Sequence, residues 1–277
     1  MKMSPTLDQG NAMTAVDPQR TRRWQMPARV VWWHRLVFLA ALVGLWELTV
    51  SVGLFNERFI SPPSAVFVAL PELLGDAGVR NGFSQTGAAT AVAFGLSIVV
   101  GVTLGALIGT SEFVCRTVRP LLMLLFAIPK MVLVPVFVLI FGLGIGTAGV
   151  FAFSLGVFPV LLNTIEGAQS VDARLRVTAH SLGAGRWHRV RYLIAPSVLP
   201  SVLTGVRLGL VQSMLGTLMA ELYGTTRGVG YYATGFAQTF QPDKVFGLLL
   251  LVALSAVSLN TALGRLEHRL ARWRVEN

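Results

Sequence analysis

The sequence predicts an all-α membrane protein with six transmembrane helices and a cytoplasmic helix-turn-helix segment between the fourth and fifth spans. Hydrophobic residues make up 53% of the 277-residue chain and charged residues only 13%, and the mean hydropathy of +0.64 is far above that of a water-soluble fold. Three stretches of 31, 35 and 20 residues, at 81–111, 131–165 and 245–264, contain no Asp, Glu, Lys, Arg or His. About 20 apolar residues are enough for a helix to cross a bilayer.

The N-terminal region is expected to be a basic cytoplasmic tail, residues 1–35, followed by the first transmembrane helix, 36–55. The tail carries six Lys and Arg residues, and Trp24, Trp32 and Trp33 near its end are typical of a membrane interface. Asn56 and its charged neighbours follow the apolar run where a signal peptide would have small residues, so we expect an uncleaved span. Residues 56–85 are then expected to form an extracytoplasmic loop.

Residues 86–265 are expected to form a core of five further helices, with a cytoplasmic tail at 266–277. The second span lies within 86–110, where Gly101, Gly105 and Gly109 fall on one helix face and permit close approach of another helix. The third span begins near Val118 and ends at a glycine cluster, 142–146, that forms a tight outer hairpin. The fourth, fifth and sixth spans are placed at 147–165, 201–222 and 245–264.

The net charge of +10 is explained by membrane orientation rather than by nucleic acid. With the first residue inside, six spans place 17 Lys and Arg residues on the inner side and four on the outer side, with Lys130 and Arg207 inside spans. Without the hairpin at 142–146, the five arginines of residues 166–200 would move to the outer side and the imbalance would shrink. Because cytoplasmic loops carry an excess of Lys and Arg, six spans with both termini cytoplasmic fit best.

Several classes of function have no sequence support. Cys115 is the only cysteine, which excludes an intrachain disulfide, and His180 and His188 have no cysteine or carboxylate nearby that would complete a metal site. None of the three lysines follows a glycine, so the chain lacks the phosphate loop of a nucleotide hydrolase. It also lacks the G-x-S-x-G turn of a serine hydrolase. We therefore expect no metal and no catalytic activity.

The basic segment, residues 166–200, is the most informative part of the chain. Five arginines lie among regularly spaced apolar residues, which predicts amphipathic surface helices rather than a span. Two short helices, 171–182 and 185–194, are expected on either side of Gly183, and Pro196 prevents easy continuation. Such a helix-turn-helix either inserts into a groove on a cytoplasmic protein or lies on the lipid surface, and the spacing alone leaves both open.

The same segment resembles the cytoplasmic "EAA" motif of binding-protein-dependent ABC importer permeases. Val177, Thr178 and Ala179 stand where the family has Glu-Ala-Ala, Gly183 stands for the motif glycine, and Leu193-Ile194-Ala195-Pro196 stands for its closing tetrad. The motif glutamate is absent. Further stretches are similar to the nitrate, sulfonate and taurine type of permease: SPPS at 61–64, IPKMVLVPVFVLIFGLG at 128–144, SLGAGRW at 181–187, PSVLTGVRLG at 200–209 and AELYGTTRGVGY at 220–231.

The resemblance implies a non-catalytic permease in a bacterial inner membrane. Two copies would form one pathway, each docking one copy of a separate ATPase that binds ATP and Mg, and an extracytoplasmic binding protein would deliver the solute. The residues it assigns to ATPase docking are Val177, Thr178, Ala179, Gly183, Arg186, Trp187, Leu193 and Pro196. The solute it suggests is a small anion such as nitrate, a sulfonate or taurine, although relatives carry other nutrients.

Four charged residues at membrane depth, Glu47, Lys130, Arg207 and Glu221, are candidates for the pathway. Such charges are costly and usually face a bundle interior or a water-filled space. Lys130 follows the helix breaker Pro129, so it either attracts an anionic solute beside irregular backbone or pairs with Glu47 or Glu221. Arg207 is expected to reach the inner interface, Glu47 to pair helices, and Glu221 either to gate the outer face or to be an interfacial carboxylate.

Other classes of transport protein are kept as alternatives. A self-sufficient channel or ion-coupled carrier is one, although the sequence lacks the repeated halves typical of carriers. A membrane-embedded enzyme is another, and it would need polar groups converging inside the bilayer.

Overall fold

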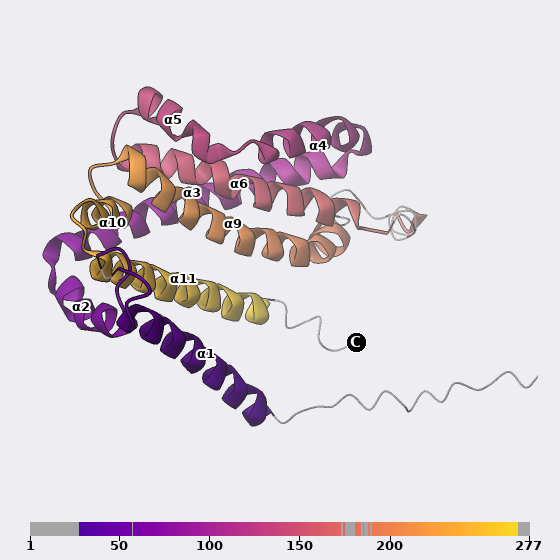
Figure 1. Ribbon diagram of the computed structural model, residues 1–277. Coiled ribbons are helices and arrows are strands. Elements are labelled where there is room, and N and C mark those ends of the chain that lie inside the picture. The colour runs from indigo at the N-terminus through magenta and orange to yellow at the C-terminus, as the bar shows by residue number, and fades with distance from the viewer. Residues whose placement is uncertain are drawn as a thin grey trace, which may run out of the picture. The chain divides into compact units, whose positions relative to one another are not determined.

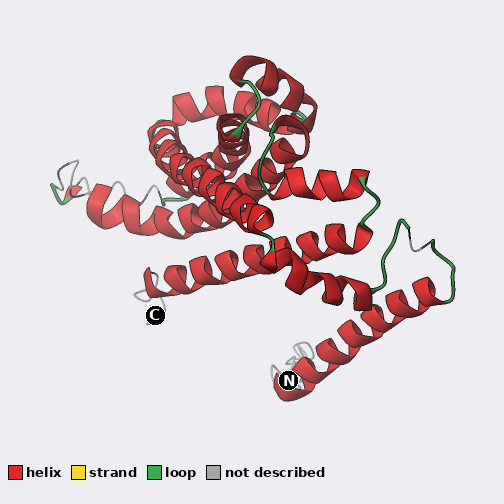
Figure 2. Ribbon diagram, turned by 90° about the vertical axis from the view of Figure 1, so that its left-hand side faces the viewer, coloured by secondary structure: helices red, strands yellow, loops and turns green. Residues whose placement is uncertain are grey.

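The computed structural model describes residues 28–270 except 57, 173, 175–180, 184, 186–187 and 189. All regular secondary structure in this part of the chain is helical (Figure 2). The chain divides into two compact units, Met1–Trp46 and Glu47–Asn277. Helix α1 (Ala28–Ser51) begins in the first unit and ends in the second. The remaining helices belong to the second unit: α2 (Pro63–Gly75), α3 (Ala77–Thr110), α4 (Glu112–Ala127), a 3₁₀ turn (Lys130–Leu133), α5 (Val134–Phe141), α6 (Ile145–Gln169), a π-helical turn (Val190–Ile194), α9 (Ala195–Gly224), α10 (Val229–Gln238) and α11 (Pro242–Leu270).

The predicted all-helical membrane fold is confirmed. In the part of the chain that the structure describes, five helices are long and apolar enough to cross a membrane by themselves: Trp32–Ser51 within α1, then α3, α6, α9 and Pro242–Glu267 within α11. The pair Glu112–Ala127 and Lys130–Phe141 passes the same test together but is bent by 75°, and gives a sixth span if both parts cross as one. We refer to residues Glu112–Phe141 as the broken span.

The core of the second unit is α6 packed against α3 and α9 (Figure 1). The predicted glycine face of α3 is confirmed as the contact with α6. A Cβ atom added at Gly101, Gly105 or Gly109 would lie 2.6–2.7 Å from side-chain atoms of Val160, Thr164 and Ala168. Because no real Cβ fits at this distance, the small residues are what allow the two helices to approach.

Several element boundaries differ from those predicted. Residues 56–85, expected as a loop, contain α2 and the first turns of α3. Pro63 is compatible with a helix because it lies in the first turn of α2, where no backbone N–H is needed. Similarly, α1 begins at Ala28, inside the stretch expected as tail, since charged residues in a first turn do not end a helix.

The hairpin between the broken span and α6 depends on glycine. Gly142 and Gly144 have φ angles of +76° and +152°, a region that residues with a side chain rarely adopt. The Thr147 hydroxyl donates to the carbonyl oxygen of Gly142, and the Gly144 N–H donates to the carbonyl oxygen of Gly224 at 3.2 Å. The turn predicted from these glycines is therefore present, and it is attached to the end of α9.

Candidate functional site

The broken span places an irregular stretch of backbone between two apolar helices. Helix α4 ends at Ala127, and Pro129 precedes the 3₁₀ turn that leads into α5. The break predicted at Pro129 is therefore present. Ile128, Met131 and Val132 around it are 43%, 47% and 73% exposed on the surface of this subunit. The last carbonyl groups of α4 cannot be used by helical N–H groups beyond the break, so they need other partners.

The Lys130 side chain folds back over this break. Its Nζ donates to the Phe126 carbonyl oxygen at 3.1 Å and lies 4.8 Å from the centre of the Phe126 ring and 4.6 Å from that of Phe158. Ring faces attract a cation without neutralising it. Within the described residues no carboxylate lies within ion-pair distance of Lys130. The ammonium is thus held in place while two of its three N–H donors stay available.

Glu221 lies near the C-terminal end of α9 and is only 3% exposed. Its carboxylate accepts from the Thr86 hydroxyl of α3 at 2.7 Å and from the Gly230 N–H of α10 at 2.9 Å. The Thr86 oxygen in turn accepts from the Val229 N–H at 2.9 Å. A Cβ at Gly228 would overlap the Glu221 carboxylate. These contacts join α3, α9 and the start of α10, so Glu221 is built into the fold and is not free to face a solute.

Arg207 is paired with a carboxylate on the last span. Its Nη2 lies 2.5 Å from Oε2 of Glu267, and the two side chains are 43% and 16% exposed. The guanidinium also packs beside Gly264, where an added Cβ would lie 2.9 Å from Nη2. The sequence indicated the position of Arg207 near one end of its span but gave no sign of this partner, which lies 60 residues away.

Glu47 acts at the start of α2. Its two carboxylate oxygens accept from the Ser64 N–H at 3.0 Å and from the Ser64 hydroxyl at 2.8 Å. A carboxylate at the first turn satisfies a backbone donor that has no helical partner, and it is favoured by the helix dipole. The contact joins the end of α1 to α2 within the second unit.

The four charged candidates therefore do not form one site. Glu47, Arg207 and Glu221 each have a partner that holds two or more helices together, whereas Lys130 has only a carbonyl group and two rings. The pairing of Lys130 with Glu47 or Glu221 that the sequence left open is not found. Phe126 could have been anticipated as a neighbour of Lys130 from the four-residue spacing, but Phe158 could not, because it belongs to α6.

Most residues of the basic segment that were assigned to docking lie outside the described residues: Val177, Thr178, Ala179, Arg186 and Trp187. Gly183 is described and has φ = +72°, with open space around its Cα. Pro196 occupies the first turn of α9, which follows directly from the π-helical turn that contains Leu193. Leu182 and Tyr192 are 81% and 70% exposed. The described parts of the basic segment thus present apolar side chains to their surroundings.

Comparison with known proteins identifies the class. The family described as "Binding-protein-dependent transport system inner membrane component" matches residues 97–274, which includes the broken span, the basic segment, α9 and α11. The chain belongs to this family, and it is a permease of the ABC importer class, of the nitrate, sulfonate and taurine type. Such a permease is a multi-pass inner-membrane protein and a non-catalytic transport subunit. Its class works with ATPase and solute-binding partners.

Individual relatives match over almost their whole length. The taurine transport system permease protein TauC of Escherichia coli is 28% identical over 93% of this chain and 95% of its own. The formylaminopyrimidine transport permease protein ThiX of Halalkalibacterium halodurans is 29% identical over 86% and 94%. The nitrate import permease protein NrtB of Synechocystis is 24% identical over 90% and 94%.

The fold also matches a solved structure. A chain from inward-facing conformations of the MetNI methionine ABC transporter aligns with 69% of this chain and 95% of its own, with a TM-score of 0.58 and 18% identity. At this level of identity the match supports the fold alone.

Proposed function

We propose that two copies of this subunit enclose a path for a small anion, such as nitrate, a sulfonate or taurine, and that the broken span lines this path. The exposed break at Pro129 is the observation that carries the proposal. Irregular backbone is tolerated at membrane depth only where it is buried in protein or lines a water-filled space, because lipid offers no hydrogen bonds. The exposed backbone of the break is thus unsuited to lipid. This supports the proposal that a second copy covers the break and that the two copies enclose water.

Lys130 supports an anion as the solute. A cation inside the membrane is costly, on the order of 2.5–3.5 kcal/mol on insertion scales, so a lysine without a carboxylate partner needs another reason to be there. The two available N–H donors of Lys130, which lie beside the Phe126 and Phe158 rings, suit the oxygen atoms of nitrate or a sulfonate. The names of the taurine permease TauC and the nitrate permease NrtB agree with an anionic group on the solute, whereas the name of ThiX indicates that the class also includes a permease for a pyrimidine.

The basic segment is proposed to dock a separate ATPase, with one copy on each permease. Support comes from the exposed Leu182 and Tyr192 and from the left-handed turn at Gly183, which is typical of a short break between two helices. ATP and Mg would be bound by the ATPase. Closure of the two ATPases would draw the two basic segments together, and the attached α6 and α9 would convert an inward opening to an outward one. A solute-binding protein would deliver the solute at the opposite face.

Charge removal at Lys130 tests the path. Lys130→Met should reduce uptake of an anionic solute by an order of magnitude or more, because the positive charge beside the break is lost, while Lys130→Arg should retain most of the uptake. Uptake is measured in proteoliposomes that contain the permease, its ATPase and the binding protein, with the ligand first identified on the binding protein.

The ATPase rate measured in the same vesicles separates a defective path from a complex that has failed to assemble. Equal uptake by Lys130→Met and the parent would remove Lys130 from the path. Solute flux without any ATPase would instead support a self-sufficient channel or carrier and overturn the proposal as a whole.

A further inference from the structure

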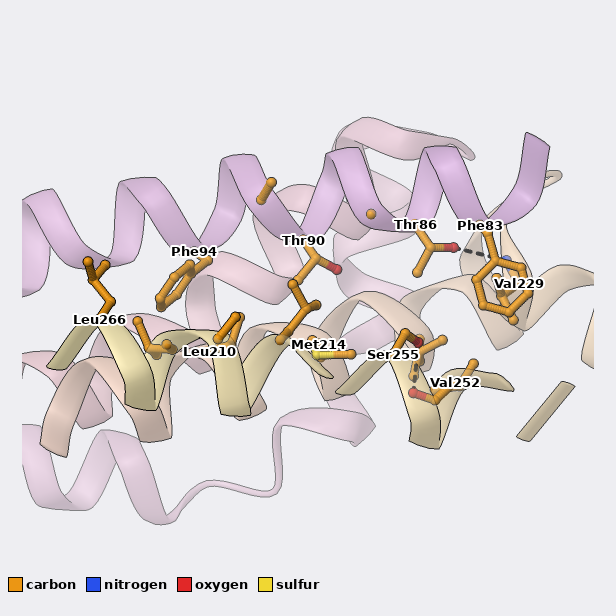
Figure 3. Close-up of a pocket in the computed structure, with 16 residues that line it drawn as sticks. Phe83, Thr86, Thr90, Phe94, Leu210, Met214, Val229, Val252, Ser255 and Leu266 are labelled. Atoms are coloured by element: carbon orange, nitrogen blue, oxygen red, sulfur yellow. Dashed lines mark hydrogen bonds between the residues drawn. The ribbon is translucent and has the colours of Figure 1, made fainter. Parts of the chain in front are cut away.

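A cavity lies between α11, α3 and α9. Its volume is about 470 Å³, and Figure 3 shows Phe83, Thr86, Thr90 and Phe94 of α3 facing Val252, Ser255 and Leu266 of α11 across it, with Leu210 and Met214 of α9 on a third side. The cavity lies apart from the broken span, and none of its lining residues belongs to that span. We call it the α3–α11 cavity.

The α3–α11 cavity has almost nothing to offer a polar solute. Three hydroxyl groups line it, and each already donates inside the protein. Thr86 donates to Glu221, Thr90 donates to Thr217 at 2.9 Å, and Ser255 donates to the carbonyl oxygen of Leu251 at 2.9 Å. The remaining lining residues are apolar, apart from Gly87. A desolvated anion or sugar would lose its hydrogen bonds to water without replacement, so the occupant has to be apolar where it touches this cavity.

The α3–α11 cavity is elongated along the helices. Its lining runs from Phe83 to Phe94 on α3 and from Val252 to Leu266 on α11, which corresponds to about 16 Å and about 21 Å at 1.5 Å per helical residue. Half the thickness of the hydrocarbon core of a bilayer is about 15 Å. Both helices are membrane-spanning by length and composition. The length and direction of the cavity therefore suit one hydrocarbon chain of one leaflet.

One end of the α3–α11 cavity carries cationic groups. Arg207 lies one helical turn from the lining residue Leu210, and its partner Glu267 follows the lining residue Leu266. The Arg207 side chain is 43% exposed, and its Nε is buried without a hydrogen-bond partner among the described residues. Arg265, on the same turn of α11 as Glu267, is exposed. Two arginines against one glutamate leave a net positive charge at this end.

We propose that the α3–α11 cavity binds an acyl chain of an anionic phospholipid, with the phosphate group at Arg207 and Arg265. An elongated apolar cavity between two membrane-spanning helices, closed to polar solutes and positively charged at one end, matches the chemistry of that lipid. The bound chain fills the gap between α11 and the α3–α6–α9 core. This inference is independent of the proposed path, because it rests on other helices and other residues.

Two glycines of α3 provide a matched pair of variants. Gly87 lines the α3–α11 cavity and Gly95 does not; an added Cβ meets nothing within 4 Å at either position. Gly87→Phe should fill the cavity without a clash at its Cβ, and Gly95→Phe should add the same bulk on the same helix at a position outside the lining. If Gly87→Phe fails to fold, Gly87→Leu fills part of the same space.

The probe is phosphatidylglycerol with a diazirine on its acyl chain, in vesicles of phosphatidylcholine that contain the permease with its ATPase. After illumination, mass spectrometry should find the label on peptides that include 83–94 or 252–266. Labelling should fall several-fold in Gly87→Phe and stay at the parent level in Gly95→Phe. Equal labelling of the two variants, or label confined to other helices, overturns the proposal.

The headgroup is tested separately with Arg265→Gln, which changes an exposed residue and leaves the Arg207–Glu267 pair intact. The labelling ratio of a phosphatidylglycerol probe to a phosphatidylcholine probe should exceed one in the parent and fall toward one in Arg265→Gln. A ratio of one in the parent contradicts an anionic lipid. Protection of the α3–α11 cavity peptides by the transported solute would identify the solute as the occupant and would also overturn the proposal.

Discussion

At the level of single residues, Glu221 shows how a carboxylate can be kept inside a membrane protein without a cation. Its oxygens accept hydrogen bonds from Thr86 and Gly230, and glycine at 228 leaves the space that the carboxylate fills. Three segments of the chain meet at this one side chain. Two glycines after Glu221 are thereby explained: Gly228 leaves room for the carboxylate, and Gly230 allows close approach of α10 to α9, where a Cβ has no room.

Loss of the Thr86 hydroxyl should weaken this arrangement. Thr86→Val removes a donor to Glu221 and an acceptor for the Val229 N–H, with almost no change of shape. Leaving buried polar groups without partners costs about 1–3 kcal/mol each. We expect a lower melting temperature of the detergent-solubilised protein, measured by loss of the monodisperse chromatographic peak on heating. Thr86→Ser keeps the hydroxyl and serves as the control; a Thr86→Val protein as stable as the Ser variant would contradict this role.

The sequence identified charged residues at membrane depth but not their partners. Glu47 and Ser64 are 17 residues apart, and Arg207 and Glu267 are 60 apart. No periodicity connects such pairs, because they depend on how separate helices come to lie together. Conversely, irregular backbone at Pro129 was predictable from local chemistry, because proline lacks a backbone N–H. The same chemistry did not distinguish it from Pro120, Pro159 and Pro200, which lie inside helices.

At the level of elements, the glycines of α3 fix the distance between α3 and α6. This feature was predictable because a four-residue spacing places side chains on one helix face irrespective of the partner. The partner itself, α6, was not predictable from that spacing. Helix α2 was missed because residues 56–85 were assigned as a whole to a loop, although Val66, Ala69 and Leu73, which are buried, recur at helical spacing.

Bulk on the glycine face should separate these helices. In Gly105→Val, the Cβ would lie 2.6 Å from Thr164 Cβ and 2.9 Å from the Leu161 carbonyl oxygen, which is backbone and cannot move away alone. Overpacking typically costs about 1–3 kcal/mol of stability. We expect a cost near the upper end of this range, because valine and Thr164 are both β-branched and the two helices are in backbone contact here. The yield of folded protein in the membrane fraction should fall. Gly95→Val, with nothing within 4 Å of its Cβ, should express as the parent does; equal losses at both positions would indicate a general effect of helix glycines.

The turn of the basic segment offers a second test at this level. Gly183 has φ = +72°, where a β-branched side chain costs about 1–3 kcal/mol, whereas Gly185, two residues on, lacks a left-handed φ and also has open space. Gly183→Val should therefore lower solute-dependent uptake and uncouple it from ATP hydrolysis, with normal membrane insertion. Gly185→Val should have little effect. Uptake and ATPase rate are measured together in vesicles, and unchanged coupling in Gly183→Val would remove this turn from the mechanism.

At the scale of the whole molecule, the distribution of arginine and lysine indicates whether the broken span crosses the membrane or turns back within it. If the bent pair crosses the membrane, the basic segment lies on the same side as the N-terminus, and the positive charges divide 17 against 4. If the pair turns back as a re-entrant loop, the basic segment and every later loop change sides, and the division becomes 10 against 11. The larger imbalance favours a full crossing, since short cytoplasmic loops retain Lys and Arg.

Cysteine labelling decides between these arrangements. Cys115 is the only native cysteine, so a Cys115→Ser background accepts single new cysteines at Leu143, 64% exposed in the hairpin after the broken span, and at Ser181, exposed in the basic segment. A membrane-impermeant maleimide should react with Leu143→Cys in intact spheroplasts and with Ser181→Cys only after permeabilisation. Reaction of Ser181→Cys from outside would place the basic segment out of reach of any cytoplasmic ATPase. The proposed docking would then be wrong, whereas the fold of α3, α6 and α9, which does not depend on the side of the membrane, would stand.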